Sequence, residues 1–376
     1  MSNISKNLLW CTNCLAMSTR PRISFDTRGW CNACVWSQTK KTLDWDSRLK
    51  ELNALLNRHR RTTGCFDCIV PVSGGKDGSY VSYNLRYKYG MSPLAVTVTP
   101  PLPSPVGEQN LMAFIARGYN HISVNPDYEM MRRLNKAGFI EKGSPYHGWL
   151  CTIETAVIQM AVRLRIPLIF YGEDGEMEYG GSTETSNSPF LSLEYISRVW
   201  FEGLDDHSKL LRSAKQSHTN SYFFELPDTS DPLTKNIEIC TWSYFENWDP
   251  YRNYLVAKEH CGLAEVDTSN SGTFTNFAQN DQELYALHTY LMYLKFGFGR
   301  ANQDACIEIR RGAMDRAQAV NLVRLYDGQY PSEFIDQYLD YYQMNQPEFD
   351  AVLDRYANRD LFEKLNGRWA PKFLVS

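Results

Sequence analysis

The stretch Phe66-Asp67-Cys68-Ile69-Val70-Pro71-Val72-Ser73-Gly74-Gly75-Lys76-Asp77-Gly78-Ser79 decides the fold of this chain. Its first half is a short apolar run, which is typical of a buried β-strand. The glycines that follow predict a tight turn, and residues 80–89 predict a helix. A strand, a glycine-rich turn and a helix in this order direct backbone N–H groups and the positive end of the helix toward one point. The stretch therefore predicts an anion-binding loop.

The side chains of this loop fit a phosphate group. Ser73 can donate a hydrogen bond, Lys76 adds a positive charge, and Gly74 and Gly75 let the backbone approach closely. A Walker A loop would need G-x4-G-K-[ST], which is not the spacing here, so a kinase or GTPase of that type is excluded. An ordinary glycine-rich turn is the alternative.

Strands and helices alternate on both sides of this loop. We expect strands at 94–99, 121–124 and 167–171, and helices at 43–60, 108–117, 128–139 and 148–164. This alternation predicts an α/β fold, with a parallel sheet and helices on both faces. Residues 172–249 are predicted to be mostly loops with a strand at 237–242. Six helices are expected after residue 250, at 251–260, 281–296, 304–311, 313–326, 331–342 and 346–356.

Four cysteines near the start of the chain form two Cys-x2-Cys pairs. Cys11 and Cys14 are separated from Cys31 and Cys34 by sixteen residues. This is the spacing of a zinc ribbon, in which four thiolates close a tetrahedral site and leave no open position for a substrate. We therefore expect structural rather than catalytic zinc. The domains predicted are a zinc ribbon at 1–40, a nucleotide-binding domain with an insertion at 41–250, and a helical region at 251–376.

Composition limits the class of protein. The chain has 376 residues, 43% of them hydrophobic, and a net charge of -4, which argues against a protein held to nucleic acid by bulk charge. No apolar run approaches the roughly 20 residues that span a bilayer, and the first ten residues lack the apolar core of a signal peptide. A cytoplasmic protein without a membrane partner is the expectation.

The loop resembles S-G-G-x-D-S, the pyrophosphate loop of the PP-loop ATP pyrophosphatases, also called adenine nucleotide α-hydrolase-like proteins. Gly78 departs from this pattern, because the family has Ser or Thr there, and Ser79 follows one position later. Read with the ribbon, the chain is similar to the N-acetyl sugar amidotransferases of the WbpG and PseA type, which serve bacterial surface-polysaccharide synthesis. The residues that carry this resemblance are the ribbon, 68–77, His147-Gly148-Trp149, 171–173, 178–181 and 295–300.

The resemblance implies an activity and a set of site residues. The family converts an N-acetyl group into an acetamidino group, and WbpG-type members act on a nucleotide-linked diacetamido uronic acid destined for O-antigen, part of lipopolysaccharide. ATP would be cleaved to AMP and pyrophosphate, with Mg²⁺ held by Asp77 and Glu173. Lys76, Asp77 and Glu173 are the expected catalytic residues. The expected ATP-binding residues are Ser73, Gly74, Gly75, Lys76, Asp77, Gly78, Ser79 and Arg300.

The ammonia is expected from a partner, because Ser2 rather than Cys follows the first Met and no nucleophile elbow of a glutaminase is present. The family implies a glutaminase subunit and an ammonia-conducting barrel subunit that resemble the two parts of imidazole glycerol phosphate synthase.

Other roles in the site remain open. Asp174 and Glu176 are weaker metal candidates. His147 could contact substrate or be structural, and Tyr171 and Tyr179 could stack on a ring or pack in the core; for Trp149 core packing is favoured.

Two other functions remain open. A zinc-ribbon tRNA thiolase would need reactive thiols, for which Cys65, Cys68 and Cys151 are available. An inactive scaffold that binds a partner through its ribbon is the other alternative.

Overall fold

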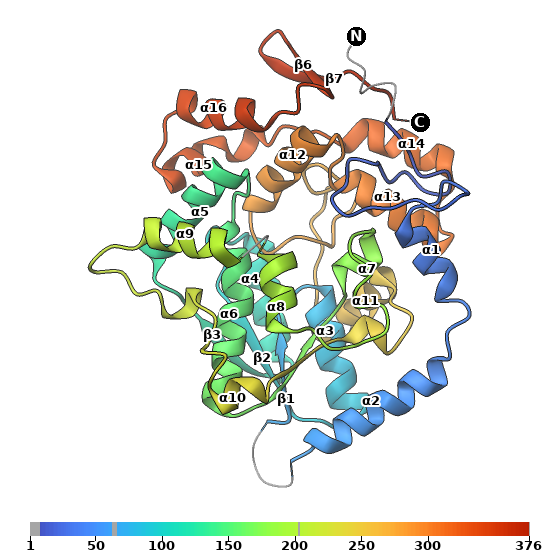
Figure 1. Cartoon of the computed structure of the whole chain (residues 1–376), viewed down its shortest axis with the longest axis vertical. Helices are drawn as coiled ribbons and strands as arrows, with labels where there is room; N and C mark the ends of the chain where they lie inside the picture. Colours follow the sequence, from blue (N-terminus) through green and yellow to red (C-terminus); the bar gives the residue numbers. More distant parts are fainter. Residues whose placement is uncertain (1–7, 62–65, 202–203, 376) are drawn as a thin grey trace.

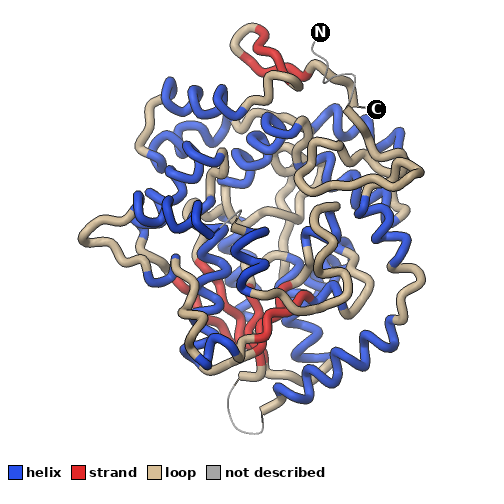
Figure 2. The backbone as a smooth tube through the Cα atoms, in the orientation of Figure 1, coloured by secondary structure: helices blue, strands red, loops and turns tan. Residues whose placement is uncertain are grey.

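The computed structural model describes residues 8–61, 66–201 and 204–375 (Figure 1). At its centre lies a five-stranded sheet in the order β3-β2-β1-β4-β5, in which all neighbouring strands are parallel. Its strands are β1 (Cys68–Pro71), β2 (Pro93–Val98), β3 (Asn120–Val124), β4 (Leu168–Tyr171) and β5 (Glu238–Thr241). The predicted parallel sheet is confirmed, and Figure 2 shows it enclosed by helices.

Side chains alternate between the two faces of the sheet, as the pleat requires. In β1, Ile69 joins one hydrophobic core, while Cys68 and Val70 join the other. In β4, Ile169 and Phe170 divide in the same way. Both faces are apolar because both are covered by helices, which is typical of parallel sheets.

The helices on the two faces come from different parts of the chain. The core that contains Ile69 also holds residues of α5 (Tyr128–Lys142) and α6 (His147–Leu164). The other core holds residues of α2 (Trp45–His59), α3 (Lys76–Tyr83) and α4 (Pro105–Ala116). A π-helical turn, η1 (Asn84–Lys88), continues α3. The predicted helices on both faces are thereby confirmed.

The order of the strands places the loops that matter. From β1 the chain moves outward to β2 and β3 on one side, and later adds β4 and β5 on the other. The loops after β1 and β4 are therefore neighbours at the carboxyl edge, at the point where the strand order reverses. Ligands of open α/β sheets bind in this crevice.

Residues 172–249 hold more helix than we expected. Besides β5, the segment contains α7 (Gly175–Tyr179), α8 (Leu193–Tyr195), η2 (Ile196–Trp200), α9 (Leu204–Ala214), η3 (Tyr222–Phe224), α10 (Pro232–Lys235) and η4 (Trp242–Tyr244). Most of these elements are only a turn or two long, so they carry no clear period in the sequence. Polar side chains cap several of them; Asp174 begins α7 and Ser192 begins α8.

The C-terminal part is helical, as predicted, but it ends in a hairpin that we did not predict. Its helices are α11 (Pro250–Val256), η5 (Ala257–Cys261), α12 (Leu284–Phe296), α13 (Arg300–Arg311), α14 (Arg316–Tyr326), η6 (Ser332–Phe334), α15 (Ile335–Tyr342) and α16 (Gln346–Tyr356). The hairpin pairs β6 (Phe362–Leu365) with β7 (Arg368–Pro371).

The N-terminal segment packs on this helical part. Residues 8–31 form irregular turns with two isolated bridges, Trp10–Met17 and Phe25–Cys31, and α1 (Asn32–Thr39) follows. The four cysteines share a buried cluster with Ala305, Cys306 and Ala319 of α13 and α14. Figure 1 shows this segment in dark blue beside both helices.

Among the described helices, none is both long and apolar enough to cross a membrane.

Candidate functional site

The predicted anion loop lies where the sequence places it. It leaves the end of β1, and Gly75 is the residue at the N-terminal cap of α3. No side chain caps this helix end, so its first N–H groups are available to a ligand. Ser73, Gly75, Lys76, Asp77 and Gly78 line a cavity of about 360 Å³.

Two glycines of the loop are needed for close packing. Gly74 has a φ of +85°, and a Cβ there would lie 2.4 Å from the backbone nitrogen of Leu111 in α4. At Gly78 a Cβ would lie 2.5 Å from the carbonyl oxygen of Pro71. The departure from the family pattern at Gly78 therefore has a physical reason: α3 packs too closely on β1 for a side chain.

Ser79 does not take the place of the missing hydroxyl in this structure. Its side chain is fully buried, its Oγ has no hydrogen-bond partner, and it is not among the cavity-lining residues.

Lys76, Asp77 and Glu173 bring opposite charges together beside the loop. Lys76 forms an ion pair with Asp77, and its side chain is only 10% exposed. Burial alone would lower the pKa of Lys76, but the negative charges of Asp77 and Glu173 outweigh burial and raise it. Lys76 therefore stays a cation, as a phosphate ligand must.

Two aromatic side chains hold the carboxylate of Glu173. The hydroxyl of Tyr179 donates to Oε1, and the indole nitrogen of Trp248 donates to Oε2 at 2.9 Å. Burial raises the pKa of Glu173, and the charge of Asp77 raises it further. Two carboxylates that repel each other in a buried cavity are what a hard cation would stabilise, so Asp77 and Glu173 fit Mg²⁺.

Arg300 reaches the same cavity from α13. Its Nε donates to Asp304 Oδ1 at 2.8 Å, and both side chains are largely buried. Asp304 Oδ2 accepts from Thr273 at 2.6 Å, which fixes the carboxylate. This ion pair is buried rather than on the surface, and its orientation leaves a guanidinium at the cavity that the loop lines, where it could bind an anionic oxygen.

Sequence reasoning missed several residues of the cavity wall. They come from the segment between η5 and α12, which contributes Phe277, Gln279, Asn280 and Asp281, and from the first turn of α12, which contributes Tyr285. Burial raises the pKa of Asp281 to about 6. The segment has no glycine-rich or periodic pattern, so only the folded chain brings it to the crevice.

Of the weaker candidates, Asp174 and Glu176 do not line the cavity. Asp174 accepts from the backbone N–H groups of Glu176 and Met177 and caps α7. Glu176 forms an ion pair with Arg22 at 2.6 Å. Both carboxylates hold the turn that carries Tyr179, so their interactions are structural.

The four cysteines of the ribbon form a group that can hold a metal ion. All are buried, and their sulfur atoms lie within 4.8 Å of one another. The Sγ atoms of Cys11 and Cys34 are 3.7 Å apart, which is too far for a disulfide. The backbone N–H groups of Cys14 and Cys31 point at the sulfur of Cys11. Sulfur atoms that accept backbone hydrogen bonds fit thiolates bound to zinc.

The ribbon is joined to the rest of the molecule by charged residues. Arg310 Nη1 lies 3.9 Å from the sulfur of Cys14, and Arg316 donates to the carbonyl oxygen of Cys11 at 2.8 Å. Lys40 forms an ion pair with Glu178 at 2.7 Å, and Trp36 donates to the same carboxylate at 3.0 Å. Glu178 directly precedes Tyr179, so the ribbon packs against the turn that holds Glu173.

A second buried group contains His147, Cys151 and His207, with ligand atoms within 4.8 Å of one another. The Nε2 of His207 contacts the carbonyl oxygen of Phe224 at 3.0 Å. Burial lowers the pKa of His147 to about 3, and nearby Lys142 lowers it further. His147 is thus a neutral, buried residue away from the cavity.

The structure shows the positions of two aromatic residues whose roles the sequence left open. Trp149 is buried and donates to the carbonyl oxygen of Val98, so it is part of the core. Tyr171 lines the cavity at the end of β4.

The cysteines that the sequence offers for sulfur transfer do not lie in the cavity, as far as the structure describes them. Cys68 is fully buried in β1, and burial raises its pKa well above the usual value. Cys151 is fully buried in α6. Cys65 lies outside the described residues. No cysteine of the described chain lines the cavity, which disfavours thiolation there.

Residues 271–373 match the family described as LPS biosynthesis protein WbpG-like, C-terminal domain. This segment is similar to the C-terminal domain of WbpG-like proteins. It supplies Arg300, Asp281 and Tyr285 to the cavity. The expected relationship to the WbpG type is thereby confirmed over the C-terminal part of the chain.

Comparisons with curated proteins and with solved structures give no further evidence on function. No curated protein matches the chain significantly. Among solved structures, a predicted subunit of tRNA methyltransferase from Methanocaldococcus jannaschii is similar, with 15% identity over 64% of this chain and 91% of that chain. Its TM-score is 0.29, which is too low for its function to bear on this protein.

Proposed function

We propose that this protein is an ATP-dependent amidotransferase that converts an N-acetyl group of a nucleotide-linked diacetamido uronic acid into an acetamidino group. One observation carries the proposal. A glycine-rich loop with Lys76 and Asp77 faces Glu173 and Arg300 across a single cavity, in a chain whose residues 271–373 are WbpG-like. Such a cavity suits the phosphates of ATP and the charge of a leaving pyrophosphate.

An amide oxygen is a poor leaving group, so the proposed reaction first activates it. The amide oxygen of the acceptor attacks the α-phosphorus of ATP, and the bond from that phosphorus to the pyrophosphate oxygen breaks. Ammonia then adds to the activated carbon, and the carbon–oxygen bond to AMP breaks. The products are an amidinium, AMP and pyrophosphate, and the charges balance without an external oxidant or reductant.

The residues of the cavity have distinct proposed roles. Ser73, the loop N–H groups and Lys76 receive the pyrophosphate as negative charge develops on it. Arg300, oriented by Asp304, binds a phosphate oxygen. Asp77 and Glu173 would hold Mg²⁺, which supplies further charge neutralisation on the phosphates. Tyr179 and Trp248 keep Glu173 oriented toward the cavity.

Ammonia would come from a glutaminase subunit through an ammonia-conducting barrel subunit. The ribbon would hold structural zinc, supported by four buried thiols in one group. A role in lipopolysaccharide biosynthesis follows from the acceptor proposed.

Isotope labelling tests the proposal. The protein is incubated with ATP, magnesium, ammonium and a UDP-linked diacetamido uronic acid whose acetamido oxygen is oxygen-18. We expect the label in the phosphate of AMP and a sugar in which NH has replaced oxygen. Unlabelled AMP, with an unchanged sugar, would contradict the amide-activation step.

A further inference from the structure

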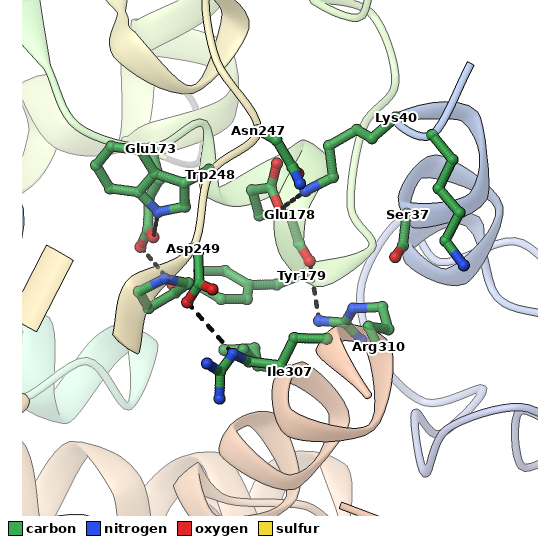
Figure 3. Close-up of a pocket in the computed structure, with 13 residues that line it drawn as sticks. Ser37, Lys40, Glu173, Glu178, Tyr179, Asn247, Trp248, Asp249, Ile307 and Arg310 are labelled. Carbon is green, nitrogen blue, oxygen red and sulfur yellow. Dashed lines mark hydrogen bonds and ion pairs between the residues drawn. The ribbon is translucent and has the colours of Figure 1, made fainter. Parts of the chain in front are cut away.

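A second pocket adjoins the nucleotide cavity on the side of the ribbon. It has a volume of about 230 Å³ and shares Glu173 and Tyr179 with the larger cavity. We call it the ribbon-side pocket. Figure 3 shows Glu173 and Trp248 at one end of it and Ser37 at the other. Besides these shared residues, its lining includes Ser37, Lys40, Lys41, Asn247, Arg310 and Arg311.

The walls of this pocket are built from segments far apart in the sequence. The end of α1 and the residues after it form one wall, the turn before α11 another, and α13 a third. The segment that directly follows the ribbon cysteines therefore lines a pocket that shares Glu173 with the larger cavity.

Several of its charges are already paired. Lys40 is bound to Glu178 at 2.7 Å, and Arg311 Nε lies 3.3 Å from Asp249. Arg310 donates to the backbone oxygen of Glu178 at 3.0 Å. These contacts fix the walls and leave a rigid pocket.

Other polar side chains of the pocket have no interaction partner among the described residues. Within the described chain, the ammonium of Lys41 has no ion-pair partner, and neither the hydroxyl of Ser37 nor the side-chain amide of Asn247 makes a hydrogen bond. Its lining carries four cationic side chains against three carboxylates, and Glu173 belongs to the ATP cavity as well. The net charge of the lining near Lys41 is therefore positive, which favours an anionic ligand.

We propose that the ribbon-side pocket binds the acceptor, and that Lys41, Ser37 and Asn247 receive its anionic part. This inference rests on the proposed function, because the amide to be activated must reach the α-phosphate of ATP. The pocket shares Glu173 and Tyr179 with the proposed ATP cavity, so a ligand in it would lie close to the nucleotide. The ligand class is an acidic sugar joined to a nucleoside diphosphate, whose carboxylate and diphosphate offer the same anionic oxygens.

Charge reversal tests the proposal with matched controls. Lys41→Glu adds negative charge to the wall after α1, and Asn247→Asp adds it to the wall before α11. Lys50→Glu makes the same change as Lys41→Glu on the exposed face of α2, outside the pocket lining. Binding of the UDP-linked diacetamido uronic acid and of ATP is measured separately by titration calorimetry. Zinc content checks that the ribbon is intact in each variant.

We expect Lys41→Glu and Asn247→Asp to weaken acceptor binding by about tenfold or more, with ATP affinity unchanged. Lys50→Glu should change neither affinity. Titration with UDP and with the free uronic acid then shows which anionic group Lys41 receives, since only one of the two should depend on it.

Two results would overturn the inference: native acceptor affinity in both pocket variants, or a loss of ATP affinity in them. Failure of the proposed function looks different. In that case the acceptor binds in a Lys41-dependent manner, but ATP and ammonium give no amidine.

Discussion

The glycine at position 78 offers a sharp test of how the loop is built. Gly78→Ser restores the hydroxyl that the family pattern has. Its Cβ, however, would lie 2.5 Å from the carbonyl oxygen of Pro71 and 3.1 Å from the Cα of Val72. Both are backbone atoms of the strand end, so β1 and α3 must separate to accept the side chain.

The cost follows from this overpacking. Forcing atoms into a packed site costs about 1–3 kcal/mol, and the better helix propensity of Ser recovers only about 0.5 kcal/mol. We expect Gly78→Ser to lower the free energy of unfolding by about 0.5–2.5 kcal/mol. ATP should bind more weakly too, because the loop is anchored by the two elements that move.

Gly75→Ser is the matched control. A Cβ there meets only the Oγ of Ser73, at 3.3 Å, and Ser is a favoured residue at a helix N-terminal cap. Its stability should change by less than about 0.5 kcal/mol. Urea unfolding followed by tryptophan fluorescence measures both variants. A Gly78→Ser protein as stable as the native one, with tighter ATP binding, would refute this account of the loop.

Three further predictions concern other parts of the molecule. Burial raises the pKa of Glu154 to about 8, so the folded state keeps its proton where the unfolded state loses it, and stability should fall between about pH 4.5 and pH 8. In Glu154→Gln, the urea concentration at the unfolding midpoint should differ less between the two pH values than in the native protein. If this difference is the same in both proteins, Glu154 is not the origin of the fall in stability. Cys31→Ser should reduce bound zinc from about one per chain to almost none by elemental analysis, whereas His207→Ala should retain it; zinc loss only in His207→Ala would place the metal elsewhere. Cys68→Ala should leave turnover nearly unchanged, because the thiol lies in the core of the sheet; abolished turnover in a folded protein would favour sulfur transfer.

Much of the fold was predictable because its elements carry local signals. Ile69 and Val70 sit in a short apolar run, and the glycines after it mark a turn. The carboxyl ends of parallel strands share one edge, so Glu173 could be placed near Lys76 before the structure was known. The cysteine spacing likewise predicted the buried group of four thiols.

Other features could not be predicted, or were overlooked. The short helices between β4 and β5 are stabilised by caps and tertiary packing, which leave no period in the sequence. Asp281 and Tyr285 reach the cavity only because the fold brings the start of α12 and the residues before it close to the loop after β1. The terminal hairpin did carry a signal: Asn366 and Gly367 both have positive φ, as an Asn-Gly hairpin turn requires.

The assignment of the cavity to ATP cleavage at the α-phosphate is the central claim, and the nucleotide products test it most directly. The native protein, Glu173→Gln and the surface control Glu194→Gln are incubated with ATP, magnesium, ammonium and the UDP-linked diacetamido uronic acid. AMP and pyrophosphate should form in equal amounts in the native protein and in Glu194→Gln, only when the acceptor is present, and should be lost in Glu173→Gln. Formation of ADP and phosphate, or AMP formation that Glu173→Gln leaves intact, would contradict the account.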